Sequence, residues 1–550
     1  MGKTLVAFDT DHIKQYVFGT DKLKEIRGAS SILDYLNRTV MTGKEKNKPL
    51  PFRVNPVYAN GGGGLFVIES DNADDAENFE RYIQREYRER TGEGASITYA
   101  VQKLPDDIKI TRNDDIEGEL VDDEKIESFL ESLRWRLREK KLIASEMISF
   151  PTHPFMRPCD SCGVFYAAPD EGRVNRDPDE RTQGELYCLS CQLKRQRDEQ
   201  VKQYIDDVVR GDKTSSDDFL WKEVRDRLEK AGYDLSSHPK RPEDFNVFAN
   251  FKGKKDYLAL IYADANSMGS SFEKCKGLKE YQILAKTVDD AIYQAVCSAI
   301  AQQLKVKDHV PAGLQPTFPF DILLMGGDDV LMAVPATVAL DVALTIANVF
   351  EKEMGKHYPD KQYTLSVGVV IAPIKYPFRL LESLVTTTLK FAKDDGEGKP
   401  RINFVTVAGS ASETFTKVFD LLRDETADKQ FFATLRPYDP ATLRHLLDAI
   451  RDGRRQNLGR SKLHQMREAI LKMNLTASSV GESLAILMNW RPSQRDNVIT
   501  YVNALANQYL IDKKGPQNLD SLHYDRPFPW FYVENKQGRD IYRTPLLHFI

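Results

Sequence analysis

The sequence ILLMGGDDVLMAV, from Ile322 to Val334, consists of two apolar runs on either side of Gly-Gly-Asp-Asp. Two such runs around a glycine pair predict a β-hairpin, because glycine adopts the positive φ that a tight turn requires. The turn would hold Asp328 and Asp329 at its tip. It would also leave space for a nucleotide beside the backbone of Gly326 and Gly327. A polar turn without any chemistry is the simplest alternative, and the motif alone does not decide between the two.

A third acid, from another part of the chain, favours a metal site. Asp264 ends a second apolar strand, LALIYA, at residues 258–263. In a ferredoxin-like sheet the first strand lies beside the central hairpin, so Asp264 would lie near Asp328 and Asp329. Adjacent carboxylates repel each other, and a divalent cation such as Mg²⁺ or Mn²⁺ relieves that repulsion. Three carboxylates at one strand end can hold two metal ions about 3.5–4 Å apart, the arrangement used for phosphoryl transfer.

Two further segments carry residue types that suit nucleotide binding. Residues 266–271, NSMGSS, are small and polar and open a helix, whose free N–H groups could hold phosphates. Two lysines three residues apart on a later helical face could neutralise a triphosphate, although such lysines more often form a solvated surface. The candidate residues in these two segments are Asn266, Ser267, Gly269, Lys390 and Lys393.

The predicted order of strands and helices repeats along the chain. Residues 4–101 and residues 255–372 both predict the order β-α-β-β-α-β, with a glycine-rich hairpin in the middle, and one more helix and strand follow the second copy up to residue 407. This pattern predicts an α+β fold with two ferredoxin-like domains. The first hairpin has glycines at 61–64 and no acids at its tip, so we expect the first domain to be catalytically silent. It would either bind a nucleotide or serve a structural role.

Two Cys-x-x-Cys pairs in one segment predict a zinc site. The pairs are Cys159/Cys162 and Cys188/Cys191. Each pair can form a knuckle whose two thiolates point at one ion. Four thiolates complete a closed tetrahedral site, so the zinc would be structural. A redox-active pair is the alternative, and it is less favoured because neither pair is expected to open a helix after a thioredoxin-like strand.

The composition excludes several classes of protein. Of the 550 residues, 41% are hydrophobic and 10% aromatic, which excludes a disordered or collagen-like chain. Asp9 and Asp11 interrupt the N-terminal apolar run and no apolar run is long enough to span a membrane, so we expect neither a signal peptide nor a membrane helix. We therefore expect an intracellular, cytoplasmic protein. The formal net charge of −5 indicates no globally basic surface, and the basic clusters at 134–141 and 194–197 are expected to be solvated.

The motifs together resemble one known family. YADANSMG (262–269) followed by MGGDD (325–329) resembles the cyclase-type palm of the large subunit of type III CRISPR effector complexes, a palm shared with the GGDEF diguanylate cyclases. FDTDHIKQYVF (8–18) and NGGGGLFVI (60–68) resemble the same family's first palm and its acid-free hairpin. Two palms around a Cys-x-x-Cys insert, followed by a helical domain, match the family's layout over most of the chain.

The resemblance implies four parts and a reaction. The expected parts are a degenerate first palm at 1–140, a zinc-binding and helical insert at 141–250, the second palm at 251–410, and a mainly helical C-terminal domain with a strand-like tail at 411–550. The family's second palm makes cyclic oligoadenylates from ATP with two divalent metals: a 3′-hydroxyl attacks an α-phosphate and pyrophosphate leaves.

By position, the resemblance assigns roles to individual residues. Asp264 and Asp328 would bind metal, and Asp329 would complete the set. The Ala265 carbonyl would add a ligand, and Gly326 and Gly327 would line the nucleotide. No His-Asp doublet occurs in the sequence, so cleavage of DNA by an HD nuclease domain is not expected. Partners would be guide-RNA complex subunits or RNA, unless the chain is a stand-alone relative.

Three functions remain open at this point. The leading hypothesis is a metal-dependent nucleotidyltransferase that makes a cyclic oligonucleotide, expected to be an oligoadenylate, from ATP in antiviral defence. The alternative is a catalytically silent scaffold or sensor that binds nucleotide or RNA through a palm fold. A template-dependent polymerase is less favoured, because the net charge of −5 does not indicate a groove for a duplex.

Overall fold

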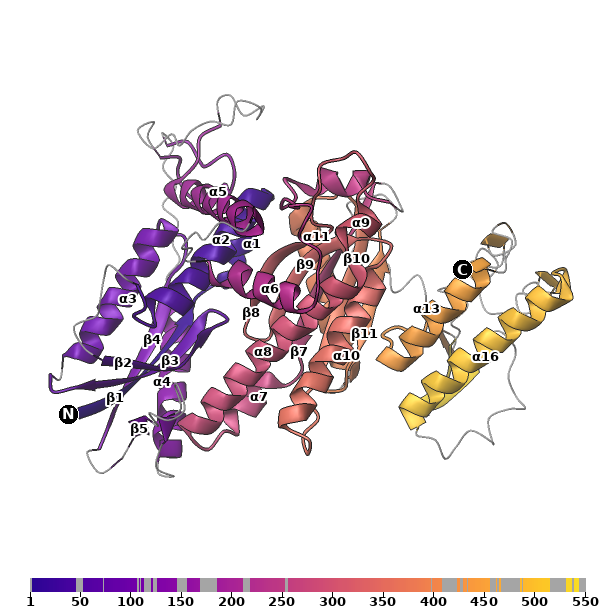
Figure 1. Cartoon of the computed structure of the whole chain (residues 1–550). Coiled ribbons are helices and arrows are strands. Elements are labelled where there is room, and N and C mark those ends of the chain that lie inside the picture. Colours follow the sequence, from indigo (N-terminus) through magenta and orange to yellow (C-terminus); the bar gives the residue numbers. More distant parts are fainter. Residues whose placement is uncertain are drawn as a thin grey trace. The chain divides into compact units, whose positions relative to one another are not determined.

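The computed structural model describes most of the chain, and everything below concerns the described residues (Figure 1). The positions outside the description are 1, 46–52, 73, 106–107, 109, 113–119, 122–125, 146–155, 169–184, 211–217, 253–255, 397, 408–422, 426–428, 433, 456–460, 462–463, 466–484, 487, 515–530, 537–538 and 544–550. The chain divides into two compact units, Met1–Tyr363 with Pro373–Ser383, and Thr364–Ala372 with Leu384–Ile550. Each unit is described by itself.

The first palm is built on a four-stranded antiparallel sheet in the order β2-β3-β1-β4. Its strands are β1 (Gly2–Thr10), β2 (Arg53–Asn60), β3 (Gly63–Ser70) and β4 (Ile97–Leu104). Its helices are α1 (Ile13–Phe18), α2 (Leu23–Tyr35), the π-helical turn η1 (Leu36–Val40), α3 (Asp75–Thr91) and α4 (Ile126–Ser145). Phe8, Phe66 and Phe79 meet edge to face in its core. The central position of β1 explains why it reads as one continuous apolar run.

The second palm contributes three antiparallel strands to the first unit, with β9 between β7 and β8. These strands are β7 (Tyr257–Ala265), β8 (Asp321–Gly326) and β9 (Asp329–Pro335). The associated helices are α7 (Met268–Glu273), α8 (Leu278–Gln303), the short α9 (Val306–His309) and α10 (Ala339–His357). Helices α8 and α10 pack side by side (Figure 1).

The insert and two short strands complete the first unit. The strands β5 (Thr111–Arg112) and β6 (Leu120–Val121) pair with each other. The insert contains α5 (Leu189–Arg210), α6 (Phe219–Lys230) and the 3₁₀ turn η3 (Phe245–Asn250), and α5 packs on α2 of the first palm.

The second unit contains a parallel strand pair and a separate sheet. Strand β10 (Leu365–Pro373) pairs with β11 (Ile402–Thr406), and α11 (Phe378–Gly396) connects them. A four-stranded sheet has the order β12-β13-β15-β14, formed by β12 (Arg423–Glu425), β13 (Lys429–Phe432), β14 (Phe531–Lys536) and β15 (Arg539–Arg543). Its helices include α13 (Pro440–Arg455) and α16 (Pro492–Lys514). The α+β class and the strand-like tail are thus confirmed. The region was expected to be mainly helical, and it contains this four-stranded sheet as well.

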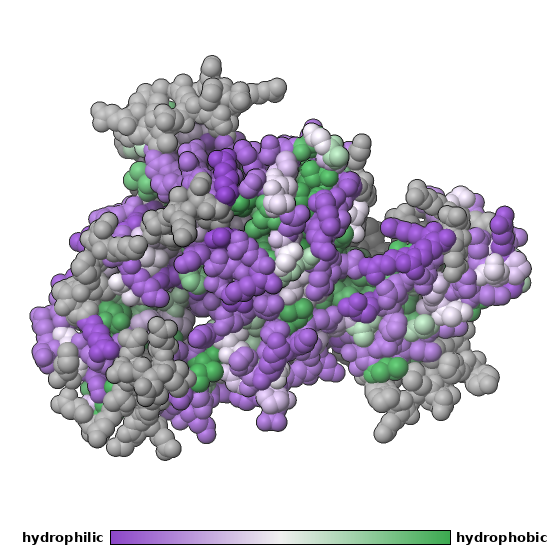
Figure 2. Space-filling view, viewed as in Figure 1, coloured by the Kyte–Doolittle hydropathy of each residue, from purple (hydrophilic) through white to green (hydrophobic). Residues whose placement is uncertain are grey.

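The described surface in the view of Figure 2 is mainly hydrophilic. Among the helices of the described residues, none combines the length and the apolar character needed to cross a bilayer.

The two palms correspond closely where their first strands end. Strands β1 and β7 have nine residues each, and each is followed by a six-residue helix. The residue before each helix, His12 or Ser267, has a positive φ of 52° or 57°. The equal lengths and the shared backbone conformation support the predicted internal duplication.

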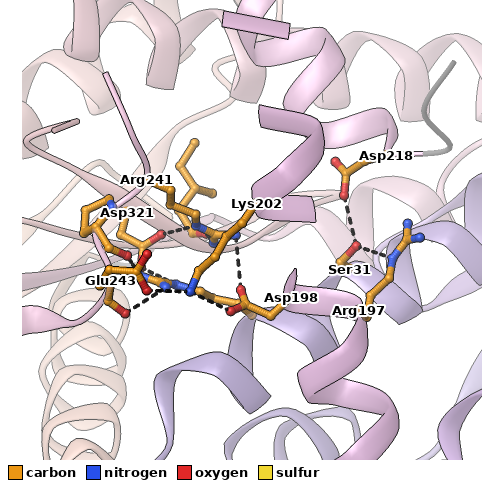
Figure 3. A network of polar contacts seen from close by, with 11 residues as sticks. Ser31, Arg197, Asp198, Lys202, Asp218, Arg241, Glu243 and Asp321 are labelled. Atoms are coloured by element: carbon orange, nitrogen blue, oxygen red, sulfur yellow. Dashed lines mark hydrogen bonds and ion pairs between the residues drawn. The ribbon is translucent and has the colours of Figure 1, made fainter. Parts of the chain in front are cut away.

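A buried ionic network joins the first palm, the insert and the strand that leads to the second hairpin (Figure 3). Asp321, the first residue of β8, accepts hydrogen bonds from Arg27 of α2 at 2.5 and 2.8 Å and from Arg241 at 2.8 Å. Arg241 also lies 3.7 Å from Asp198 of α5, which pairs with Lys202 at 3.2 Å. The Arg27 and Asp321 side chains are fully buried, so the charges compensate each other out of contact with water.

The two guanidinium groups control the ionisation of Asp321. Burial acts to raise the pKa of this carboxyl, but Arg241 and Arg27 outweigh burial and hold the pKa below its usual value. The carboxylate is therefore charged at neutral pH. It anchors the start of β8 to two segments that are distant in sequence.

We expect Asp321→Ala to destabilise the first unit by about 3–5 kcal/mol, because it removes the acid that pairs with the buried Arg27 and leaves Arg241 only its longer contact with Asp198. Arg81→Ala is the matched control. It breaks an exposed pair with Glu77 and should cost about 0–1 kcal/mol. Urea denaturation followed by circular dichroism measures both changes, and equal losses in the two variants would contradict the role assigned to the buried network.

Candidate active site and metal centre

The structure brings Asp264, Asp328 and Asp329 together at one end of the second palm. Strands β7 and β9 pair in a register that places Asp264 directly opposite Asp329. The turn between β8 and β9 consists of Gly327 and Asp328, since Gly326 pairs with Asp329. One carboxylate oxygen from each acid lies within 4.8 Å of the others, and all three residues are half-buried.

The backbone holds this arrangement from both sides. Gly327 has a φ of +65°, which a glycine adopts without strain and which begins the tight turn. Behind the turn, the Ala265 N–H donates to the Asp328 carbonyl at 3.3 Å, which ties the tip of the hairpin to the end of β7. The three carboxylates therefore approach each other because of backbone pairing, and hard oxygen ligands at this spacing suit Mg²⁺ or Mn²⁺.

The negative charge of the site affects the pKa of Tyr262, two residues before Asp264. Burial, and then the charges of Asp329 and Asp264, raise the pKa of the Tyr262 hydroxyl well above its usual range. Glu382, at the beginning of α11, adds to the same effect. From the first palm, the Lys14 amine lies over the Tyr262 ring, 5.1 Å from its centre. The site is thus strongly negative, as a site for divalent cations requires, with one lysine nearby.

The hairpin tip of the first palm lies against the tip that carries the acids. A Cβ placed on Gly327 would lie 3.4 Å from the Cα of Gly61, and one placed on Gly61 would lie 3.5 Å from the Cα of Gly327. Both distances are ordinary van der Waals contact, so the positive φ values of Gly61 and Gly327, +59° and +65°, favour glycine here more than any lack of space. Part of the space beside Gly327 is therefore filled by the first palm, and the expected contact of Gly326 and Gly327 with a nucleotide stays a prediction.

The first palm lacks two of the three acids of the carboxylate cluster. Asn60 pairs with Gly63 across its hairpin, so Gly62 and Gly63 occupy the places that Asp328 and Asp329 take in the second palm. Asp9, opposite Gly63, is the counterpart of Asp264, and it forms an ion pair with Lys141 of α4 at 2.5 Å. Lys141 thus neutralises the charge of Asp9, the one acid of the three that the first palm retains, so no metal ion is needed there.

The other predicted nucleotide-binding residues lie in two places. Asn266 is buried, whereas Ser267 and Gly269 are exposed around the first turn of α7. The Ser267 carbonyl accepts hydrogen bonds from the hydroxyls of Ser270 and Ser271 at 2.9 and 3.1 Å. Two further candidates, Lys390 and Lys393, lie on the part of α11 that belongs to the second unit. Their proposed contact with a triphosphate stays a prediction.

The four cysteines form one cluster. The sulfurs of Cys159, Cys162, Cys188 and Cys191 all lie within 4.8 Å of one another, and Cys162 and Cys188 are 3.8 Å apart. The second pair lies at the beginning of a helix, because α5 starts at Leu189. The residues just before it, 185–188, are not a strand, and the sulfurs of both pairs face each other. This geometry fits one tetrahedral metal ion better than a redox-active pair.

The expectation that the basic clusters are solvated is wrong in part. Lys194 is buried and donates to the Tyr16 carbonyl at 2.7 Å, and Lys141 pairs with Asp9. Arg134 of α4 donates to the Phe272 carbonyl at 3.0 Å. These side chains connect segments that are far apart in sequence, so no local pattern distinguishes them from a solvated face.

Comparison with known proteins agrees with the geometry of this site. Residues 257–403 match the family model of the Cas10/Cmr2 second palm domain. These residues are similar to a Cas10/Cmr2-type palm. The family resemblance expected from the sequence is therefore confirmed for this segment, which carries all three acids. A search of the curated proteins found no match.

The solved structures that match this chain include Csm1–Csm4 cassettes. The cassette in complex with cA4 has 14% identity and a TM-score of 0.49, over 87% of this chain and 64% of that chain. The apo cassette has 14% identity and a TM-score of 0.47, over 94% and 68%. The cassette in complex with cA3 has 14% identity and a TM-score of 0.49, over 91% and 69%. The chain thus spans less than two thirds of the length of the first of these matches.

We expect the carboxylate cluster of the second palm to bind Mn²⁺, and Asp264→Asn or Asp328→Asn to weaken this binding roughly tenfold or more, because each removes one ligand charge. Electron paramagnetic resonance of free Mn²⁺ during titration measures the affinity. Asp360→Asn, which removes an exposed acid on the same unit, is the control and should bind Mn²⁺ as the wild type does. Equal affinity in all four proteins would contradict the assignment.

We expect the four cysteines to hold one metal ion per chain, and Cys191→Ser to release it and lower the temperature of unfolding. A metal bound only by the folded state contributes its binding energy to stability. Elemental analysis and thermal denaturation measure the two effects. Cys275→Ser changes a cysteine outside the cluster, so it should retain the metal. A full complement of metal in Cys191→Ser would contradict the proposed site.

Proposed function

We propose that the chain is a metal-dependent nucleotidyltransferase that joins ATP molecules into a cyclic oligoadenylate signal for CRISPR-type antiviral defence. The observation that supports this function is the convergence of Asp264, Asp328 and Asp329 within 4.8 Å in a segment that matches a Cas10/Cmr2 palm. Adenine and the cyclic product follow from the family resemblance. The phosphoryl-transfer chemistry follows from the site itself.

The three acids would hold Mg²⁺ or Mn²⁺ between them, with the Ala265 carbonyl as a further ligand. When bound, such a pair of ions neutralises phosphate charge and favours the ionised form of an attacking hydroxyl. The 3′-hydroxyl of one nucleotide would form a bond to the α-phosphate of another, and the bond to pyrophosphate would break. The chain's main contribution is to position these groups, since two paired strands fix the acids before substrate arrives.

The remaining predicted residues would bind the nucleotides. The segment of Asn266, Ser267 and Gly269 would face the phosphates through its backbone N–H groups. Lys390 and Lys393 would add positive charge. We also propose a catalytically silent first palm, because Gly62 and Gly63 replace its acids and Lys141 neutralises Asp9.

The other proposals concern the ion in the cysteine cluster and the protein's surroundings. Four thiolates without a further donor favour zinc in a structural role. We propose a cytoplasmic protein whose partners are RNA or subunits of a guide-RNA complex. We also propose the division into parts at residues 1–140, 141–250, 251–410 and 411–550.

Incubation with each nucleoside triphosphate and Mg²⁺ or Mn²⁺, with and without RNA, tests the proposed function. We expect pyrophosphate release with ATP and a cyclic product by mass spectrometry. Asp328→Ala should lower the rate roughly 10²–10³-fold, because the loss of a metal site removes several kcal/mol of transition-state stabilisation. Asp360→Ala is the control and should leave the rate unchanged. Tight ATP binding without pyrophosphate under every condition would overturn the proposal and favour the silent sensor.

A further inference from the structure

Lys14 is an exposed lysine of α1 that reaches from the first palm to the second. Its amine lies 5.1 Å from the centre of the Tyr262 ring, and Tyr262 lies two residues before Asp264 on β7. Residues two apart on a strand point to the same face of the sheet, so the side chains of Tyr262 and Asp264 share a face. Lys14 therefore covers the face of β7 from which Asp264 projects, and the chemistry described so far gives this lysine no role.

The positive charge of Lys14 is available to a ligand. Among the described residues, its amine forms neither a hydrogen bond nor an ion pair. Two other cations close to α1 already have acidic partners. Lys141 pairs with Asp9 at 2.5 Å, and Arg379 pairs with Asp21 at 3.8 Å. Exposed lysines are common on any protein surface, so the position of Lys14 against the carboxylate site, and not its exposure, distinguishes it.

The charges of the proposed reaction require a cation at this place. The three aspartates and a pair of divalent ions would together carry a single net positive charge. A triphosphate brings several negative charges, so most of its charge would stay uncompensated by the metal site alone. Enzymes that transfer phosphoryl groups supply lysine or arginine side chains for the remaining charge. An unpaired lysine beside the carboxylates meets this requirement.

Helix α1 holds the backbone of Lys14 in a fixed place. The neighbouring Tyr16 is only 3% exposed, and its carbonyl accepts a hydrogen bond from the Lys194 amine at 2.7 Å. At the end of the helix, the Phe18 ring packs against the Phe378 ring, with the ring centres 6.0 Å apart. Because the helix is attached at both points, the lysine amine stays close to the site before substrate arrives, which lowers the entropic cost of binding.

We propose that Lys14 binds the β- and γ-phosphates of the nucleotide whose α-phosphate is attacked, an inference that rests on the proposed transferase function. In that reaction the bond between the α-phosphorus and the bridging oxygen breaks, and pyrophosphate leaves with the electron pair of that bond. The ammonium group would compensate the charge that develops on the pyrophosphate, and no proton has to move. The first palm, silent by its own hairpin, would thus contribute a substrate-binding residue to the second.

The test is calorimetric titration of the full chain with α,β-methylene-ATP in the presence of Mn²⁺, because this analogue cannot release pyrophosphate. We expect Lys14→Ala to bind the analogue roughly tenfold more weakly than the wild type, and Lys14→Arg to recover most of the affinity, since it restores the charge. AMP has no β- and γ-phosphates, so the wild type and Lys14→Ala should bind AMP equally well. A merely structural role of Lys14 would weaken the binding of both ligands.

Lys103→Ala is the matched control. Lys103 is an exposed lysine of the same palm, and the pairing of β4 with β1 places it opposite Thr4, at the far end of the sheet from α1. This variant should bind the analogue as the wild type does.

Three results would overturn the proposal: equal affinity of the wild type and Lys14→Ala for the analogue, equal losses for the analogue and AMP, or no binding of the analogue by the wild type. Pyrophosphate release from ATP is measured separately. A wild type that binds the analogue through Lys14 and releases no pyrophosphate would refute the transferase function, and the phosphate-binding role of Lys14 would stand.

Discussion

The register between β7 and β9 is the constraint on which the site depends. Each step of this antiparallel pairing matches buried apolar residues, from Leu258 opposite Pro335 to Ala263 opposite Val330, and only at its end does it place Asp264 opposite Asp329. A shift by one residue would turn every side chain of β7 to the other face of the sheet. The core thus selects the register, and the register brings the acids together against their mutual repulsion.

The other palm and the insert stabilise this end of the structure from outside. The two hairpin tips meet at Gly61 and Gly327, whose φ values of +59° and +65° favour glycine at both positions. At the opposite end of β8, the buried pairs of Asp321 with Arg27 and Arg241 connect the strand to α2 and to the segment of the insert between α6 and η3. The hairpin is therefore held at its base by charge and at its tip by close backbone contact. In this arrangement the first palm supports the carboxylate site although its own hairpin tip carries no acids.

Much of this arrangement could be predicted from the sequence, because it rests on local patterns. Apolar runs around Gly326–Gly327 predict the hairpin, and the repeated order of strands and helices predicts that Asp264 lies beside it. Two closely spaced cysteine pairs indicate a shared ion. The positions of Lys14 and Glu382 near the site could not be predicted from the sequence. An exposed lysine or a helical glutamate has the same local sequence pattern whether or not it lies near a site. Arg27 and Asp321 are 294 positions apart in the sequence, and no periodic pattern in the sequence predicts a contact between residues so far apart.

A crystal structure of the protein soaked with Mn²⁺, with anomalous diffraction recorded at the manganese edge, examines the shared carboxylate site without any assumption about substrate. We expect anomalous density between the hairpin tip and the end of β7, with oxygens of Asp264, Asp328 and Asp329 in the first coordination sphere. Density confined to other acids, or an ion that Asp264 does not reach, would show that the three carboxylates do not act as one metal site.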